Sequence, residues 1–76
     1  MEIKVKEIMS QVFNVPEDSI DSLSSPDTIE SWDSLKHMNL VTALEEEFNI
    51  RLTYEQISEM LNFSLIIEVL KENGIQ

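Results

Sequence analysis

The chain has 76 residues, of which 42% are apolar, and it contains no cysteine. This length allows one small domain, residues 1–76, near the lower limit for a self-sufficient core, and the lack of cysteine excludes disulfides and thiolate metal sites. Fifteen acidic and five basic residues give a net charge of −10, which disfavours nucleic acid and anionic membranes and favours partners with basic patches. A carrying or binding role fits this composition better than autonomous catalysis.

The first segment is amphipathic, unlike a secretory signal. Five apolar residues at helical spacing predict a helix over residues 3–13: Val5, Ile8, Met9, Val12 and Phe13. Pro16 favours an end to this helix, because the residue before a proline avoids the α region. No segment approaches the roughly 20 apolar residues of a membrane span, so we expect a soluble, cytoplasmic protein. A monomer is the expected state, although the sequence itself does not determine it.

Residues 16–33 have no helical period and are rich in proline, serine and aspartate. Connections of this length in small domains tend to be functional or to pack on themselves. We expect Ile20, Leu23 and Ile29 to hold this loop against the helices, and residues 28–30 to form a short turn. Calcium binding is not expected, because the loop lacks the sixth-position glycine of an EF-hand.

A second helix is predicted over residues 34–47, beginning at Asp33 or Ser34, which are both good N-cap types. At 100° per residue its apolar residues separate into two sets. The set that predicts a core stripe is Leu40, Val41, Leu44 and Phe48. The other side carries Leu35 and Met38 together with Asn39, Thr42 and Glu46.

The last third of the chain predicts a linker and two further helices. Residues 48–52 alternate in polarity, as a linker docked on the helices does. Thr53 and Gln56 then fit a capping box for a short helix from Tyr54 to residue 60 or 61. Ile57 and either Met60 or Leu61 should face inward. Ser64 is predicted to cap a last helix over residues 65–73, with Lys71 in its last turn and Gly74 just beyond. The expected buried side of that helix is Leu65, Ile66, Val69 and Leu70.

The segment from Ser31 to Leu35 joins the long loop to the second helix. A serine here is by default only a cap, but Asp33 can cap in its place. The Ser34 hydroxyl would then lie free at the positive end of the helix dipole, a position that suits a phosphate ester. Trp32 is interpreted as an anchor of the loop on the helices.

His37 follows Ser34 by one helical turn, so a catalytic Ser–His pair has to be considered. Such a pair needs an orienting acid and oxyanion donors in a dry pocket, and a domain of this size offers no obvious pocket. The helical geometry instead predicts a partly buried histidine packed against the loop.

Two motifs carry a resemblance to a known family. Trp32-Asp33-Ser34-Leu35 opens a helix and is followed by Leu44-Glu45-Glu46-Glu47-Phe48, a pattern that resembles the acyl carrier protein family. The resemblance implies an all-α four-helix bundle with a long first loop and a short third helix. It also implies a non-enzymatic carrier that holds acyl groups as thioesters on 4′-phosphopantetheine.

The resemblance assigns roles to individual residues. A phosphopantetheinyl transferase would attach the arm from coenzyme A to Ser34, with Asp33 assisting the modification. Acyl-loading and acyl-using enzymes with basic patches would then dock on the second helix. The expected docking residues are Leu35, Met38, Thr42, Glu45 and Glu46.

The resemblance is uneven just after the motif. Carriers of bulk fatty-acid synthesis usually have acidic residues at the positions of Lys36 and Asn39, so this chain suggests a specialised carrier for a lipid, polyketide or related pathway. Two alternatives remain at this point: an aminoacyl or peptidyl carrier, and an unmodified acidic helical docking module in which Ser34 is only a cap.

Overall fold

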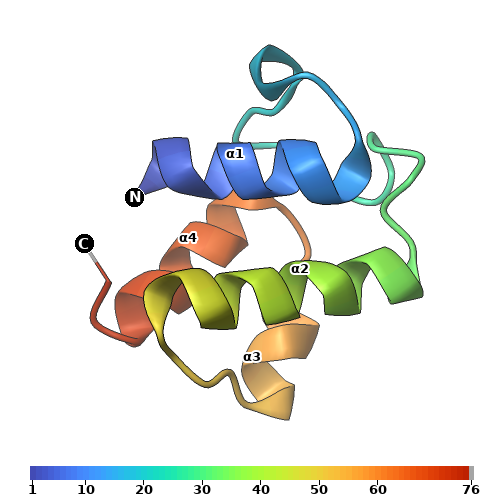
Figure 1. Ribbon diagram of the computed structural model, residues 1–76. Coiled ribbons are helices and arrows are strands. Elements are labelled where there is room, and N and C mark those ends of the chain that lie inside the picture. Colours follow the sequence, from blue (N-terminus) through green and yellow to red (C-terminus); the bar gives the residue numbers. More distant parts are fainter. Residues whose placement is uncertain (76) are drawn as a thin grey trace.

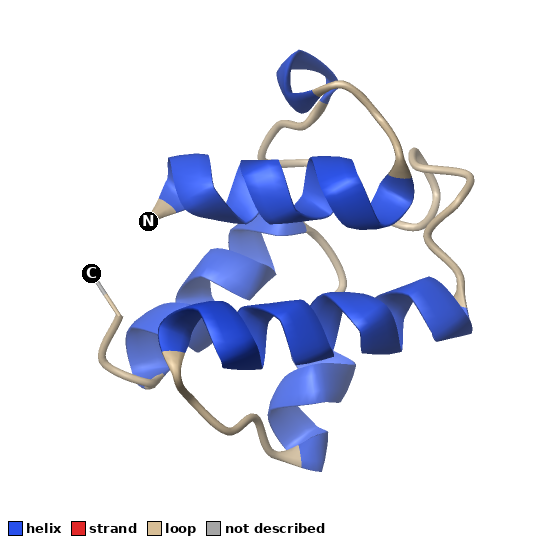
Figure 2. Cartoon of the chain, viewed as in Figure 1, coloured by secondary structure: helices blue, strands red, loops and turns tan. Residues whose placement is uncertain are grey.

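The computed structural model describes residues 1–75 and contains four α-helices (Figure 1). These are α1 (Glu2–Phe13), α2 (Ser34–Phe48), α3 (Tyr54–Glu59) and α4 (Phe63–Glu72), with a 3₁₀ turn, η1, at Glu17–Ser19 in the first loop. Residues 1–75 contain no strand (Figure 2). The prediction of an all-α four-helix fold with a long first loop and a short third helix is confirmed.

The core lies between α1, α2 and α4. α1 and α2 run in opposite directions, α4 crosses behind them, and α3, drawn below α2, contacts α4 (Figure 1). Burying one large aliphatic side chain stabilises a fold by about 1.5–3 kcal/mol, so a small set of such residues holds the helices together. Six residues have no exposed area: Val5, Met9, Leu40, Leu44, Ile66 and Leu70.

The helix boundaries agree with the local signals in most places. α1 and α2 both end in an asparagine with left-handed backbone, Asn14 at φ 56° and Asn49 at φ 54°. The Thr53–Gln56 capping box at the start of α3 is present in both directions. Gly74, at φ 83°, follows the end of α4 in the left-handed region, where glycine carries no steric penalty.

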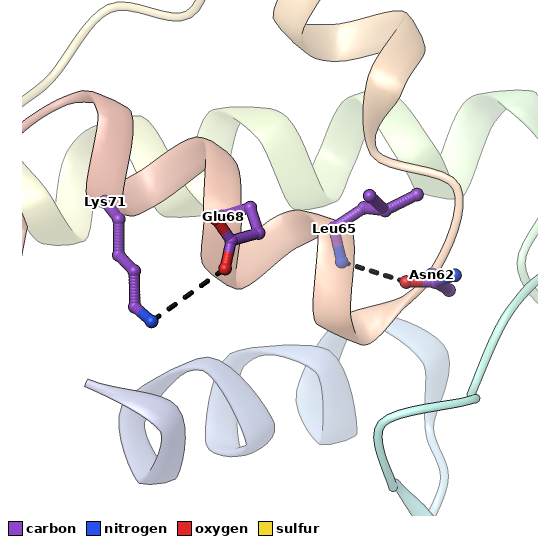
Figure 3. A network of polar contacts seen from close by, with 4 residues as sticks. All are labelled: Asn62, Leu65, Glu68 and Lys71. Carbon is purple, nitrogen blue, oxygen red and sulfur yellow. Dashed lines mark hydrogen bonds and ion pairs between the residues drawn. The ribbon is translucent and has the colours of Figure 1, made fainter.

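The predicted start of the last helix is wrong by two residues. Asn62, not Ser64, is the N-cap, and its Oδ1 accepts a 2.9 Å hydrogen bond from the Leu65 N–H (Figure 3). Leu65 is 38% exposed, and Ile67 is buried, which the prediction omitted. At the other end Lys71 lies in the last turn as predicted, 3.9 Å from Glu68 in an exposed ion pair that contributes little stability.

The long loop is held by its backbone as well as by its apolar residues. Ile20 and Ile29 are buried as predicted, but Leu23 is 77% exposed, so its predicted role as an anchor is wrong. The two serines next to Leu23 in the chain explain its exposure. The carbonyls of Ser22 and Ser24 accept hydrogen bonds from the first two N–H groups of α4, at 3.4 Å and 2.9 Å, which leaves Leu23 pointing outward.

Candidate functional site

At the start of α2, the residue that caps the helix and the candidate functional serine are two different residues. Asp33 has extended backbone and its Oδ1 accepts a 2.8 Å hydrogen bond from the Lys36 N–H, so Asp33 is the N-cap. Ser34 is the first helical residue, is exposed, and makes none of the hydrogen bonds that close the helix start. Its hydroxyl therefore lies at the positive end of the helix dipole without a structural task.

The segment before the serine is fixed to α1. Trp32 is 4% exposed, and its ring stacks on Phe13 with centroids 4.8 Å apart. The Ser31 hydroxyl donates a 2.7 Å hydrogen bond to the Phe13 carbonyl. Trp32 is thus an anchor of the loop, as its sequence position predicted, and Ser34 is held at a defined place beside the helices.

His37 connects three elements and has no free ring nitrogen. The Trp32 indole N–H donates to Nδ1 at 3.0 Å, and Nε2 lies 3.0 Å from the carbonyl oxygen of Ile57 in α3. The ring is half-buried, as predicted. With both nitrogens engaged by other partners, His37 cannot act as a base toward Ser34 in this arrangement.

An open pocket of about 470 Å³ lies next to the serine. The size of the domain had suggested that no obvious pocket would form, and this expectation is wrong. Asp33, Ser34 and His37 form part of its wall, and most of its remaining wall is apolar. The apolar residues come from the loop, α2 and the region around α3: Pro26, Trp32, Met38, Ile57, Met60 and Leu61.

The α3 side of this pocket was not identified as functional from the sequence. Ile57, Met60 and Leu61 were expected only as candidate core residues. Met60 is 1% exposed, whereas Leu61 is 61% exposed on the pocket rim. No local signal relates them to Ser34, because the three residues lie more than 20 positions further along the chain.

Four of the five residues expected to contact partners lie at exposed positions along α2. Leu35 is 70% exposed and Met38 47% exposed, so both apolar side chains are accessible from solvent. Thr42 and Glu46 are exposed as well, one and two turns further on. The Thr42 hydroxyl donates to the Met38 carbonyl at 3.1 Å, a contact within the helix.

Glu45 differs from the others because it has a contact inside the chain. It is half-buried, and its Oε2 accepts a 2.9 Å hydrogen bond from the Leu52 N–H. This bond ties the linker after α2 back to the helix. Glu45 therefore has a structural reason for its position, which Glu46 and Glu47 do not share.

None of the helices within residues 1–75 has the length and apolar composition needed to cross a membrane. In the same part of the chain, no three histidine, aspartate or glutamate side chains gather in a way that could hold a metal ion.

Comparison with known proteins finds a similar protein of known family. Over 72 residues the chain is 32% identical to the protein named acyl carrier protein of Buchnera aphidicola subsp. Baizongia pistaciae (strain Bp). The match covers 95% of this chain and 92% of that protein. No family model matches the chain.

Proposed function

Because this chain belongs to the acyl carrier protein family, we propose that it holds acyl groups as thioesters on a 4′-phosphopantetheine arm attached to Ser34. The observation that carries this proposal is the exposed Ser34 hydroxyl at the start of α2, left free because Asp33 caps the helix. Residues 1–76 form a single carrier domain in this proposal, acting in the cytoplasm as a monomer.

The residues around Ser34 fit such a group. A phosphate ester on the Ser34 oxygen would face the free N–H groups and positive dipole of a helix N-terminus. When bound, the arm would supply the thiol that the chain itself lacks, since no cysteine is present. Asp33 is exposed and uses one carboxylate oxygen for the cap, so it remains accessible to assist the transferase.

The role proposed for this chain is delivery rather than catalysis. Acyl carrier proteins carry intermediates between enzymes, and both ring nitrogens of His37 are engaged away from Ser34. Tethering an acyl group raises its effective concentration at the active site of each partner. The chemistry then belongs to the partner enzymes.

Incubation with coenzyme A and a broad-specificity phosphopantetheinyl transferase tests the proposal. Intact-mass measurement is expected to find the mass of one phosphopantetheine added to each chain, and not two, because Ser34 is the one serine that directly follows an N-cap aspartate. A chain that keeps its original mass under conditions that fully load another acyl carrier protein would contradict the proposal. An unmodified docking module would then be the better explanation of what the chain does.

We propose further that partner enzymes dock on the exposed side of α2. Leu35→Ala is expected to lower kcat/KM of the transferase about tenfold, since an exposed apolar residue beside the modified serine is a candidate hot spot. Leu23→Ala is the matched control, because Leu23 is 77% exposed against 70% for Leu35 but lies in the loop. Equal kinetics of the two variants would remove Leu35 from the docking face.

The same experiment tests the electrostatic part of this docking proposal. With a net charge of −10, including the exposed Glu46, the chain should bind basic partner surfaces. Raising the salt concentration should therefore raise KM of the transferase, because salt screens charges across an interface. A KM independent of salt would contradict the electrostatic contribution and leave only the apolar one.

The pathway is proposed from the first turn of α2. Lys36 and Asn39 occupy positions at which carriers of bulk fatty-acid synthesis usually have acids, and this favours a specialised lipid, polyketide or related pathway. The loaded protein should be elongated slowly by a fatty-acid synthase set that elongates a housekeeping carrier. Elongation at the same rate would contradict the specialised role. Loading by an amino-acid-activating enzyme would instead favour the aminoacyl carrier.

A further inference from the structure

The hydrogen bonds of His37 define its protonation state. The Trp32 indole N–H can only donate, so the Nδ1 atom that it meets at 3.0 Å must be an unprotonated acceptor. The remaining nitrogen, Nε2, then carries the single proton and donates it to the Ile57 carbonyl, 3.0 Å away. This arrangement requires the neutral ring with its proton on Nε2.

The ring joins the three elements that surround the serine. Trp32 lies in the loop and stacks on Phe13 of α1, His37 lies in α2, and Ile57 lies in the last turn of α3. The Ile57 carbonyl also accepts a 3.4 Å hydrogen bond from the Met60 N–H, so the contact with His37 is a second bond at the end of α3. α3 has only six residues and none of them is fully buried, so it depends on contacts of this kind.

We propose that His37 is a positioning residue for the Ser34 site, which fixes the loop and α3 around the pocket only while the ring is neutral. A proton taken up from solvent would bind Nδ1, the atom that faces the Trp32 N–H. Two N–H groups would then point at each other, and the Trp32–His37 bond would break. The use of the pocket depends on the proposed function, whereas the hydrogen bonds that join Trp32, His37 and Ile57 do not depend on it.

Among the residues that line the pocket, Asp33 and His37 are the ones with titratable side chains. Lys36, the one cation near His37 in sequence on α2, is half-buried and does not line the pocket. α1 presents the uncharged Phe13 ring. The other titratable residues of the neighbouring loop and α3 are exposed and lie outside the pocket: Glu17, Asp18, Asp21, Asp27, Glu30, Tyr54, Glu55 and Glu59.

The chain has one tryptophan and one histidine, which makes the test direct. In the unmodified protein, the indole N–H resonance of Trp32 is followed by NMR from pH 8 to pH 5, the range in which histidine changes charge. The indole resonance and the backbone amides of Ser34 and Leu61 are expected to move together with one midpoint. An indole resonance that does not move over this range would overturn the proposal.

His37→Gln separates this role from a merely structural one. The glutamine amide offers an acceptor and a donor but does not titrate, so the acid-dependent movement should disappear. At pH 5.5 the Trp32 N–H of the wild type should exchange with solvent about tenfold faster than that of the variant, because an opened bond exposes the proton. Identical pH profiles in both proteins would show that the response does not come from His37.

Trp32→Phe provides a second route if the glutamine variant does not fold. Phenylalanine keeps an aromatic ring on Phe13 but has no N–H to face Nδ1, so the Ser34 and Leu61 amides should move less than half as far on acidification. An undiminished response would overturn the proposal. All these readouts use the unmodified chain, so a failure to load Ser34 with phosphopantetheine would contradict the proposed function and leave this inference standing.

Discussion

Ser34→Ala is expected to abolish loading with phosphopantetheine completely while leaving the fold unchanged. The loss is complete because removal of the hydroxyl removes the only atom proposed to accept the phosphate. The fold is expected to persist because Asp33, and not Ser34, supplies the N-cap bond to the Lys36 N–H. Intact mass gives the loading, and circular dichroism with urea unfolding gives the stability, which should change by less than about 0.5 kcal/mol.

Ser64 offers a matched control for this substitution. It is also an exposed serine in the first turn of a helix, α4, and Asn62 caps that helix as Asp33 caps α2. Ser64→Ala should therefore load as fully as the wild type. If the Ser34 variant still gained the mass of one phosphopantetheine, attachment at Ser34 would be wrong. If it lost its helical signal, the free hydroxyl would be a structural group after all.

The features that the sequence predicted well are those with a local cause. The capping box at Thr53 and the left-handed Gly74 just beyond α4 depend on residues within one turn of each other, and both are present. The position of Ser34 was predicted for the same reason, because Asp33 directly precedes it and is an equally good cap. These features need no knowledge of the rest of the fold.

The features that were missed depend on distant parts of the chain. Leu23 has the composition of an anchor, but hydrogen bonds between its neighbours and the start of α4 turn it outward. Glu45 looks like any surface acid until the linker brings the Leu52 N–H to its carboxylate. The pocket arises in the same way, since its walls around Ile57 and Leu61 reach Ser34 only after α3 packs beside α2.

The N-cap of α4 shows why a local rule can also select the wrong residue. Asn62 and Ser64 are both good cap types, and a cap rule alone does not choose between them. Phe63 decides the matter, because it is 3% exposed and belongs to the core as the first residue of the helix. Tertiary burial therefore fixes a boundary that the two candidate caps leave open.

Trp32→Ala is expected to be the most destabilising change near the site. Truncating a buried tryptophan to alanine costs about 3–5 kcal/mol. Trp32 is 4% exposed, stacks on Phe13, and donates to His37, so the loss includes packing and a buried hydrogen bond. A domain of this size has a total stability of roughly 4–11 kcal/mol, so the variant should be close to unfolding. Urea unfolding measures the change, and the melting temperature should fall by more than about 12 °C.

Tyr54→Ala is the control that ties this effect to burial rather than to the loss of an aromatic residue. Tyr54 is 90% exposed at the start of α3, so its removal should change the free energy of unfolding by less than about 0.5 kcal/mol. If both variants were equally stable, Trp32 would not anchor the loop, and the fixed position of Ser34 beside its pocket would need another cause. If only the Trp32 variant is destabilised, Trp32 also holds the proposed attachment site in place. Asp33 and Ser34 would then depend on Trp32 for their position. Without this anchor the start of α2 would be loosely held, and Ser34 would have no defined pocket beside it.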